Sequence, residues 1–450
     1  MKKLSLLLSS LLLLSGCASS PERTSAEFLQ QAVIYEVNLR QFGNGGFQEV
    51  TDHLPRLSEL GVDILWLMPI HPISELNRKG TLGSPYSVAD YLKVNPEYGT
   101  EEDLRELINQ AHSKNMLVIL DWVANHTGWD NPWITQHPDW YSKDLDGNIT
   151  YPPGTDWTDV ADLDFSNLEM QEAMISAMEY WVKEFDVDGF RADVAHSVPI
   201  EFWNKASERL HKIKDVFMLA EDGGDMALLE SAFDTNYAWS YQGLFNGLGY
   251  TYVTSLEFSY AIKAQQEQYK DGKYQMVFID NHDENSWQAT VFDRFGDNVK
   301  NLAVISFTIP GMPLIYSGNE IGLYRQLQFF EKDPIVFPEK SDWGKSDWEQ
   351  FYKKLTDLKA QNPALWTAGA GGELIPLHEE DSFFLAFGRS YQGNQVVVLV
   401  NLMADQQTQL IDPGQFAGTY KDFFTGAELE LSGEVSLPGN SFQVLTRDSN

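Results

Sequence analysis

Gly189-Phe190-Arg191-Ala192-Asp193 ends an apolar run that is typical of a buried strand, and it places a carboxylate where that run stops. Two later stretches have the same form, Leu219-Ala220-Glu221-Asp222 and Phe278-Ile279-Asp280-Asn281-His282-Asp283. In a parallel barrel the carboxyl ends of the strands point to one face, so residues far apart in sequence converge there. We therefore expect the three stretches to bring together their acids: Asp193, Glu221 and Asp283.

Apolar runs typical of strands alternate with helical patterns from residue 33 onward. This alternation is typical of βα units around a parallel sheet, and eight such units close a (β/α)8 TIM barrel. A sixth unit near residues 234–260 has the weakest strand pattern of the eight. The other seven predicted strands are 33–39, 63–70, 116–121, 188–193, 216–221, 275–280 and 312–317.

Two departures from the alternation predict additional parts. Residues 127–165 are rich in Trp, Pro, Asp and Gly and are too long for an ordinary connection, so we expect an inserted subdomain after strand three that covers the site. Beyond residue 372, short alternating strands separated by Gly, Asp and Asn predict a C-terminal antiparallel β-sandwich domain. The predicted boundaries are 31–126 and 166–366 for the barrel, 127–165 for the subdomain and 373–450 for the C-terminal domain.

The composition narrows the class of ligand. The formal net charge of -33 argues against nucleic acid or an anionic membrane surface, because both would repel so many carboxylates. A neutral substrate fits better. The chain holds 13 Trp and 19 Tyr, which suit stacking on sugars, although aromatic residues also fill large cores.

The N-terminus has the pattern of an export signal over residues 1–16: two lysines, an apolar run and small residues. Leu14-Ser15-Gly16-Cys17 resembles the lipobox of a bacterial lipoprotein, which implies a lipid anchor on Cys17 followed by a tether over 17–30. Cys17 is the sole cysteine of the chain, so an intrachain disulfide is excluded. The alternative is an ordinary secretory peptide with an incidental cysteine. The residue after Cys17 is Ala18 rather than Asp, and by analogy with lipoprotein sorting this favours attachment to the outer membrane.

Three neighbouring acids suit the cleavage of a glycosidic bond. That reaction needs an acid to protonate the leaving oxygen and a second carboxylate that activates water or attacks the sugar. Arg191 lies two residues before Asp193 on the same strand face and could keep that carboxylate ionised. The residues alone leave open whether Glu221 or Asp283 is the acid.

Four segments in order resemble the motifs of the α-amylase family, glycoside hydrolase family 13. They are Asp121-Trp122-Val123-Ala124-Asn125-His126, residues 189–196, Glu221 and Asn281-His282-Asp283. The resemblance extends over the chain after the tether, and agreement of several motifs at the ends of predicted strands is hard to reach by chance. It implies a retaining hydrolase of α-linked glucans.

The resemblance also implies roles for single residues. Asp193 would be the nucleophile, Glu221 the general acid/base and Asp283 a third acid that binds sugar hydroxyls and stabilises the transition state. The implied substrate-binding residues are Tyr86, His126, Arg191 and His282.

A calcium ion is implied by only part of the pattern. Asn125 and Asp162 match two oxygen ligands that many family members use, and such hard oxygen donors suit calcium. The segment Val194-Ala195-His196-Ser197 lacks the usual Lys-His pair, so a third ligand is missing from the match. Calcium binding is left open, and no organic cofactor is expected.

Several functions remain open at this level. The leading hypothesis is an exported, lipid-anchored α-amylase that cleaves α-1,4 bonds of starch or maltooligosaccharides. The alternatives are an α-glucosidase, an α-1,6-acting hydrolase, a transglycosylase, or a non-catalytic surface glucan-binding protein. A barrel enzyme of unrelated chemistry is the fold-level alternative, since one barrel supports many reactions.

Overall fold

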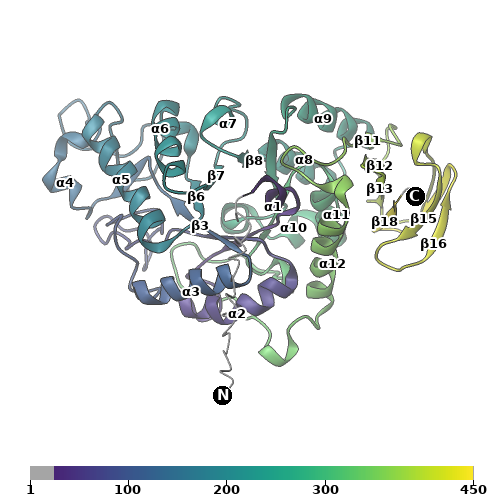
Figure 1. The fold of residues 1–450 in the computed structure, drawn as a ribbon, viewed down its shortest axis with the longest axis horizontal. Helices are drawn as coiled ribbons and strands as arrows, with labels where there is room; N and C mark the ends of the chain where they lie inside the picture. Colours follow the sequence, from purple (N-terminus) through teal and green to yellow (C-terminus); the bar gives the residue numbers. More distant parts are fainter. Residues whose placement is uncertain (1–24, 449–450) are drawn as a thin grey trace, which may run out of the picture.

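The computed structural model describes residues 25–448 of the chain. Figure 1 shows an elongated molecule with the barrel in the middle, the inserted segment around α4 at one end and the C-terminal strands at the other. The predicted fold class is confirmed: a parallel eight-stranded barrel precedes an antiparallel C-terminal domain.

Eight parallel strands close the barrel in the order β1-β10-β9-β8-β7-β6-β3-β2. They are short and buried along their whole length, since helices cover the outside and side chains fill the inside. The weak sixth unit is present as β8. The bounds are β1 Ile34–Val37, β2 Ile64–Leu67, β3 Leu117–Trp122, β6 Gly189–Ala192, β7 Phe217–Ala220, β8 Thr235–Tyr237, β9 Tyr274–Val277 and β10 Met312–Tyr316.

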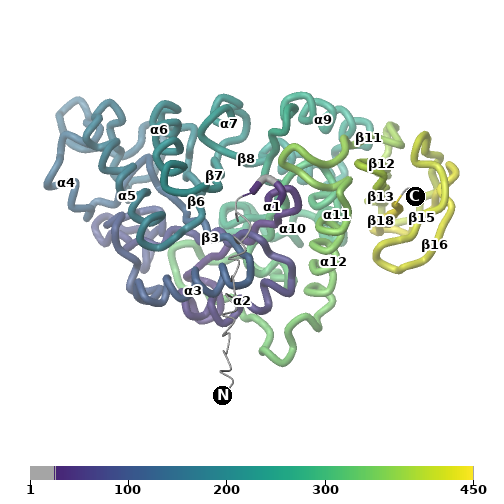
Figure 2. The backbone as a smooth tube through the Cα atoms, viewed as in Figure 1, coloured from purple at the N-terminus to yellow at the C-terminus, as the bar shows by residue number. Residues whose placement is uncertain are grey.

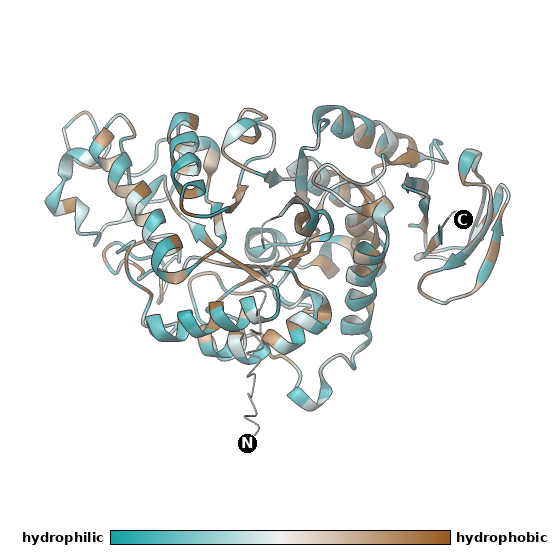
Figure 3. Ribbon diagram, in the orientation of Figure 1, coloured by the Kyte–Doolittle hydropathy of each residue, from teal (hydrophilic) through white to brown (hydrophobic). Residues whose placement is uncertain are grey.

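Helices follow the strands and cover the barrel. Several begin with side-chain caps, such as Thr100 before α3 and Asn167 before α5, which accept from free N–H groups of the first turn. Figure 3 shows apolar residues along the barrel strands and polar residues on much of the helical surface. The helices are α2 Phe47–Leu60, α3 Glu101–Ser113, α5 Leu168–Phe185, α6 Ile200–His211, α7 Leu228–Ser231, α8 Trp239–Gly249, α9 Ser255–Gln268, α10 Val291–Phe295, α11 Val299–Thr308 and α12 Asp347–Gln361.

Helix α1, Ala26–Gln31, lies at the end of the barrel where the strands begin. Leu29 packs in one cluster with Ile34, Ile64 and Leu117, which are the first residues of three barrel strands. The prediction of a tether as far as residue 30 is therefore corrected at its end, because the apolar Leu29 makes residues 26–31 part of the barrel. The predicted signal peptide 1–16 and Cys17 lie outside the described residues.

The inserted segment leaves the barrel after β3. Its main regular element is the antiparallel pair β4 His126–Gly128 and β5 Val160–Asp162, in which His126 lies opposite Asp162. Between them lie only short helices, α4 Trp133–Gln136 and η1 Pro138–Trp140. The pair fixes both ends of the segment beside the carboxyl end of the barrel.

The C-terminal domain has a six-stranded antiparallel sheet in the order β11-β12-β13-β18-β15-β16 and a separate pair β14-β17. Alternate residues of β13 face two cores: Val397 and Leu399 face the domain's own cluster, whereas Val396 and Val398 join the barrel cluster. Figure 2 shows this sheet beside α9 and α11. The bounds are β11 Ile375–Pro376, β12 Phe384–Tyr391, β13 Asn394–Asn401, β14 Gln407–Leu410, β15 Gly418–Asp422, β16 Glu428–Leu431, β17 Glu434–Leu437 and β18 Ser441–Asp448.

Within residues 25–448, no helix is both long enough and apolar enough to cross a bilayer.

Candidate active site

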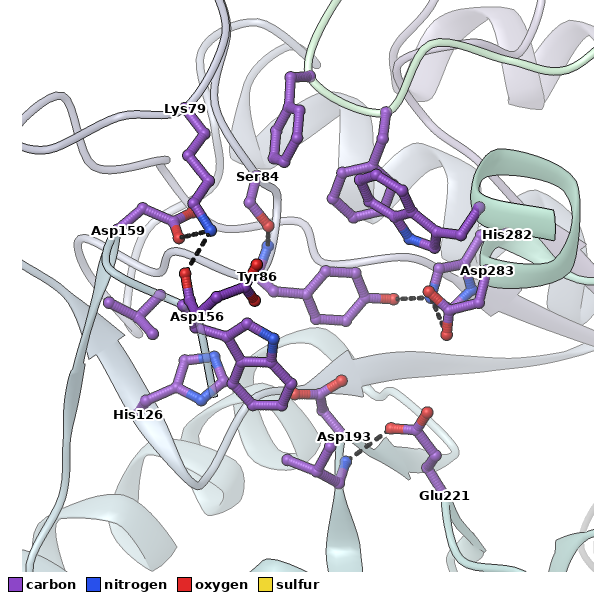
Figure 4. Close-up of a pocket in the computed structure, with 16 residues that line it drawn as sticks. Lys79, Ser84, Tyr86, His126, Asp156, Asp159, Asp193, Glu221, His282 and Asp283 are labelled. Atoms are coloured by element: carbon purple, nitrogen blue, oxygen red, sulfur yellow. Dashed lines mark hydrogen bonds and ion pairs between the residues drawn. The ribbon is translucent and has the colours of Figure 1, made fainter. Parts of the chain in front are cut away.

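A cavity of about 630 Å3 lies at the carboxyl end of the barrel strands, where the inserted segment meets the barrel. Figure 4 shows Asp193 and Glu221 on one side of it, Asp283 and His282 on another, and Lys79 close to Asp156 and Asp159 of the inserted segment. Every predicted catalytic and substrate-binding residue except Arg191 lines the cavity. Those residues are Asp193, Glu221, Asp283, Tyr86, His126 and His282.

The register of the barrel brings Asp193 and Glu221 together. Ala192 of β6 pairs with Ala220 of β7, so the residue after each strand projects at the same level. The N–H of Asp193 donates to the carbonyl of Trp122 at 2.9 Å, and that of Glu221 donates to the carbonyl of Ala192 at 3.0 Å. The sheet's own hydrogen bonds therefore hold both acids.

Arg191 lies beneath the cavity and is fully buried. Its Nη1 donates to Oδ1 of Asp121 at 2.8 Å and to Oδ1 of Asp193 at 2.9 Å, and its Nε donates to Oη of Tyr237 at 3.0 Å. Its Nη2 lies 2.9 Å from Oε2 of Glu221. One guanidinium thus fixes three carboxylates from three neighbouring strands.

The backbone after Asp193 supports Glu221. Val194 has φ 38°, a left-handed conformation that is unfavourable for a β-branched residue. In this conformation its N–H donates to Oε2 of Glu221 at 2.7 Å. Strain of this kind persists where the surrounding structure fixes it, and here it orients an acid of the cavity.

The acid cluster holds more carboxylates than cations. Burial raises the pKa of Asp193 well above its usual range; Arg191 opposes that shift, and the nearby Glu221 and Asp121 reinforce it. Burial likewise raises the pKa of Asp121, against the effect of Arg191. One guanidinium cannot neutralise three carboxylates, and this excess of negative charge favours the protonated forms of Asp193 and Asp121.

Tyr86 connects His282 to the acid cluster. Its Oη lies 2.8 Å from Nε2 of His282 and donates to Oδ2 of Asp121 at 3.0 Å. The Tyr86 and His282 rings are nearly parallel, with centroids 5.4 Å apart. A protonated His282 can therefore donate to Tyr86 while the tyrosine donates to Asp121, which fixes the orientation of all three.

His282 is held as a cation. Burial by itself would lower its pKa, but the carboxylates of Asp283 and Glu36 raise it to about 9. Its Nδ1 lies 2.5 Å from Oε1 of Glu36 in β1, and its Nε2 lies 3.4 Å from Oδ2 of Asp283. The imidazolium thus ties the third acid of the cavity to the first strand of the barrel.

His126 has the opposite protonation state. Burial lowers its pKa to about 4, so the ring is neutral at ordinary pH. Its ring lies 5.7 Å from that of Trp157, which also lines the cavity. A neutral imidazole can both accept from and donate to sugar hydroxyls.

Asn125 and Asp162 offer an incomplete set of calcium ligands. Asn125 lies directly before β4 and Asp162 ends the neighbouring β5, but the amide of Asn125 is 3.3 Å from Nδ1 of His126. Calcium takes six to eight oxygens. Over residues 25–448 no three His, Cys, Asp or Glu side chains come together in a group able to hold a metal. Asn125 and Asp162 account for only part of such a set, and no chemical step is assigned to the ion.

Sequence reasoning missed several residues of the site. Glu36 gave a signal, because it is a charged residue within an apolar strand, and so did Asp121, which ends the third strand. Tyr237 lies on the weakly patterned β8. No feature of the sequence separated the cavity aromatics from core aromatics; they are Trp157, Trp287, Phe329 and Phe330.

Comparison with known proteins agrees with the family resemblance of the sequence motifs. A family model described as "Alpha amylase, catalytic domain" matches residues 24–397. A cyclomaltodextrinase of Thermoanaerobacter pseudethanolicus is 27% identical over 428 residues, which cover 90% of this chain and 71% of that protein.

Two solved structures resemble the chain over nearly its whole length. An alpha-amylase from Lactobacillus plantarum has 32% identity and a TM-score of 0.82, covering 94% of this chain and 100% of that one. A maltogenic alpha-amylase from Thermotoga neapolitana has 28% identity and a TM-score of 0.84, with the same coverage.

Proposed function

Because the chain belongs to the α-amylase family of glycoside hydrolases, we propose that it cleaves the α-1,4 bonds of starch or maltooligosaccharides with retention of configuration. It is an enzyme that hydrolyses glycosidic bonds. The observation that carries the finer proposal is the contact of Asp193 and Glu221 with one guanidinium. This shared partner keeps the two carboxyl groups close, which favours the short separation of retaining enzymes.

In the first step Asp193 attacks the anomeric carbon of the glucosyl unit held against Tyr86. Arg191 orients the attacking oxygen through its 2.9 Å contact and favours the ionised form of Asp193 against the effect of burial. Glu221 acts as the general acid and donates a proton to the departing glycosidic oxygen. A covalent glycosyl-enzyme bond forms as the glycosidic bond breaks.

In the second step Glu221, now ionised, accepts a proton from water, and the oxygen of that water attacks the same carbon. The bond to Asp193 breaks, and its carboxylate returns to Arg191. Two inversions give retention of the α configuration. An acceptor sugar in place of water would give transglycosylation by the same chemistry.

Asp283 supports these steps from the opposite side. It lines the cavity beside the cationic His282, and both can bind hydroxyls of the sugar that reacts. The transition state carries positive charge at the anomeric carbon, which the carboxylates of Asp193 and Asp283 can stabilise while Arg191 and His282 hold them in place.

The experiment that tests the proposal is parallel digestion of amylose, pullulan, isomaltooligosaccharides and maltose, with products separated by size. We expect maltooligosaccharides from amylose and little product from isomaltooligosaccharides. The Asp193→Asn variant should lose activity by roughly a thousandfold or more while keeping its melting temperature. Full activity of this variant would contradict the proposed nucleophile, and glucose as the sole early product would favour an α-glucosidase.

We also propose that the chain is exported and held at the outer membrane by a lipid on Cys17. Helix α1 lies at the end of the barrel away from the cavity, so an anchor on that side would leave the cavity open to glucans. Cell fractionation of the Cys17→Ser variant tests the anchor. Release of this variant from the membrane fraction is expected, whereas retention equal to that of the parent chain would contradict the proposal.

A further inference from the structure

Three aromatic side chains form one wall of the cavity next to Asp283: Trp287, Phe329 and Phe330, which we call the aromatic wall. The Trp287 ring lies 5.0 Å from the Phe329 ring and 5.7 Å from the Phe330 ring. The two phenylalanine rings meet edge to face at 5.2 Å. The wall is therefore a packed cluster rather than three separate rings.

The aromatic wall continues the surface on which the reacting sugar is proposed to stack. The Phe329 ring lies 6.2 Å from the Tyr86 ring and only 9° from parallel to it. His282 is also close to parallel with both rings. Sugar rings stack on aromatic faces through their C–H groups, so a second flat face beside the first suits the adjoining unit of a glucan.

Trp287 leaves 52% of its surface exposed and lines the cavity that also holds Asp193, Glu221 and Asp283. A large aromatic side chain usually buries more of its area, and an exposed one at a cavity wall is typical of a binding surface. The residue lies in the π-helix η3, Glu284–Gln288, an uncommon conformation that is frequent at functional sites.

The π-helix that carries Trp287 is rigidly fixed. Oε2 of Glu284 accepts from Gln242 at 2.7 Å and from Arg294 at 3.1 Å, and all three side chains are buried. Oδ1 of Asn285 accepts from the N–H of Leu327 at 2.9 Å, which ties the helix to the segment before Phe329. The exposure of Trp287 is thus not the result of a loose loop.

The backbone that carries Phe329 and Phe330 is held by two side chains from the loop after β1. Nη1 of Arg40 donates to the carbonyl of Phe329 at 3.2 Å and to that of Gly83 at 2.8 Å. The side chain of Gln41 donates to the carbonyls flanking the pair, those of Gln328 and Glu331, at 2.7 and 2.8 Å. Residues directly after β1 therefore hold the aromatic wall beside the segment of Tyr86.

We propose that the aromatic wall binds the glucosyl unit adjoining the one that reacts, with Trp287 as its main stacking face. The proposal rests on the proposed function, since it assigns a further part of the same site. It predicts that Trp287 sets the preference for longer maltooligosaccharides, because a substrate must extend beyond the reacting unit to reach it.

The experiment compares the full chain with its Trp287→Ala and Trp287→Tyr variants on maltooligosaccharides of two to seven units. We expect kcat/KM for the longest substrates to fall roughly tenfold in Trp287→Ala. For the shortest substrate the decrease should be smaller, and Trp287→Tyr should recover most of the loss. Tyr252→Ala is the control, because Tyr252 is 81% exposed but does not line the cavity.

An equal decrease at every chain length would overturn the proposal, since it would indicate a general disturbance of the site. No decrease at any length would overturn it as well. Calorimetric binding of maltoheptaose to Glu221→Gln, with and without Trp287→Ala, tests the wall independently of turnover. Weaker binding in the double variant supports the wall, and equal binding contradicts it. Failure of the proposed function would be recognised separately, as the absence of hydrolysis by the unaltered chain.

Discussion

Arg191 donates from Nη1 to Oδ1 of Asp193 at 2.9 Å, and the arginine side chain is fully buried. The same guanidinium contacts Asp121, Glu221 and Tyr237. It therefore acts as the common support of the acid cluster. A planar fork of five donors can hold these partners at once, whereas an ammonium group cannot.

Arg191→Lys should lower kcat by roughly a hundredfold, because the lysine keeps the charge but loses the fixed contacts to the acids. Steady-state kinetics on maltoheptaose measure the effect. The melting temperature should fall less than in Arg191→Met, which leaves the buried carboxylates without a cation.

Arg209→Lys is the matched control for that substitution. Arg209 likewise contacts more than one carboxylate. Its partners are Glu172 and Glu179, and the contacts lie on the surface of α6, away from the cavity. Its replacement should leave kcat unchanged. Comparable losses in both variants would contradict the special role of Arg191.

His282 links stability to pH. Its pKa is about 9 in the folded chain and 6.5 ordinarily, so its stabilising effect is complete below pH 6.5 and is lost as the pH rises through 9. The shift corresponds to at most about 3 kcal/mol. We expect the melting temperature of the parent chain to exceed that of His282→Asn by more at pH 6 than at pH 9.5.

His71→Asn provides the comparison. His71 is also buried, but burial lowers its pKa to about 4, so the folded chain holds it neutral over the same pH range. The difference in melting temperature between the parent chain and His71→Asn should stay constant from pH 7 to 9.5. If the difference in melting temperature between the parent chain and His282→Asn did not change with pH, His282 would not be protonated in the folded chain.

Lys79 connects the barrel to the inserted segment across the cavity. Its Nζ donates to the carbonyl of Asp156 at 2.9 Å and lies 3.2 Å from Oδ1 of Asp159. Because Lys79 is one-third exposed, Lys79→Met should raise KM by only about twofold to fivefold, with little change in kcat. Lys93→Met, which removes an exposed ion pair with Asp90, should change neither constant.

Chelation tests the metal expectation. Asn125, whose amide contacts His126, and Asp162 alone form an incomplete set of calcium ligands, so we expect EDTA to leave both the melting temperature and the activity unchanged. Differential scanning fluorimetry with EDTA and with added calcium measures this. A melting temperature that falls with EDTA and returns with calcium would contradict the expectation.

The sequence predicted the barrel because its strands are apolar runs ending in chemically distinctive residues such as Asp193 and Glu221. Even β8, whose pattern was weak, is present. Its weakness has a physical reason: Thr235 and Asn236 are polar although they are buried, so the strand lacks a continuous apolar run.

The contacts that define the site could not be predicted in the same way. Glu36 meets His282 across 246 residues of sequence, and this pairing depends on how the barrel closes. Trp287 is a cavity residue only because η3 fixes it outside the core. The predicted tether over 17–30 includes most of helix α1, whose packing on the barrel through Leu29 could not be predicted from the chain pattern alone.

The central claim is retaining cleavage of an α-1,4 glucan by Asp193 and Glu221. Proton NMR of maltoheptaose digestion, recorded in the first minutes, identifies the anomer released before mutarotation. The α anomer should appear first with the unaltered chain, and no reducing ends should appear at that time with Asp193→Asn. Initial release of the β anomer, or unchanged release by the variant, would contradict the account.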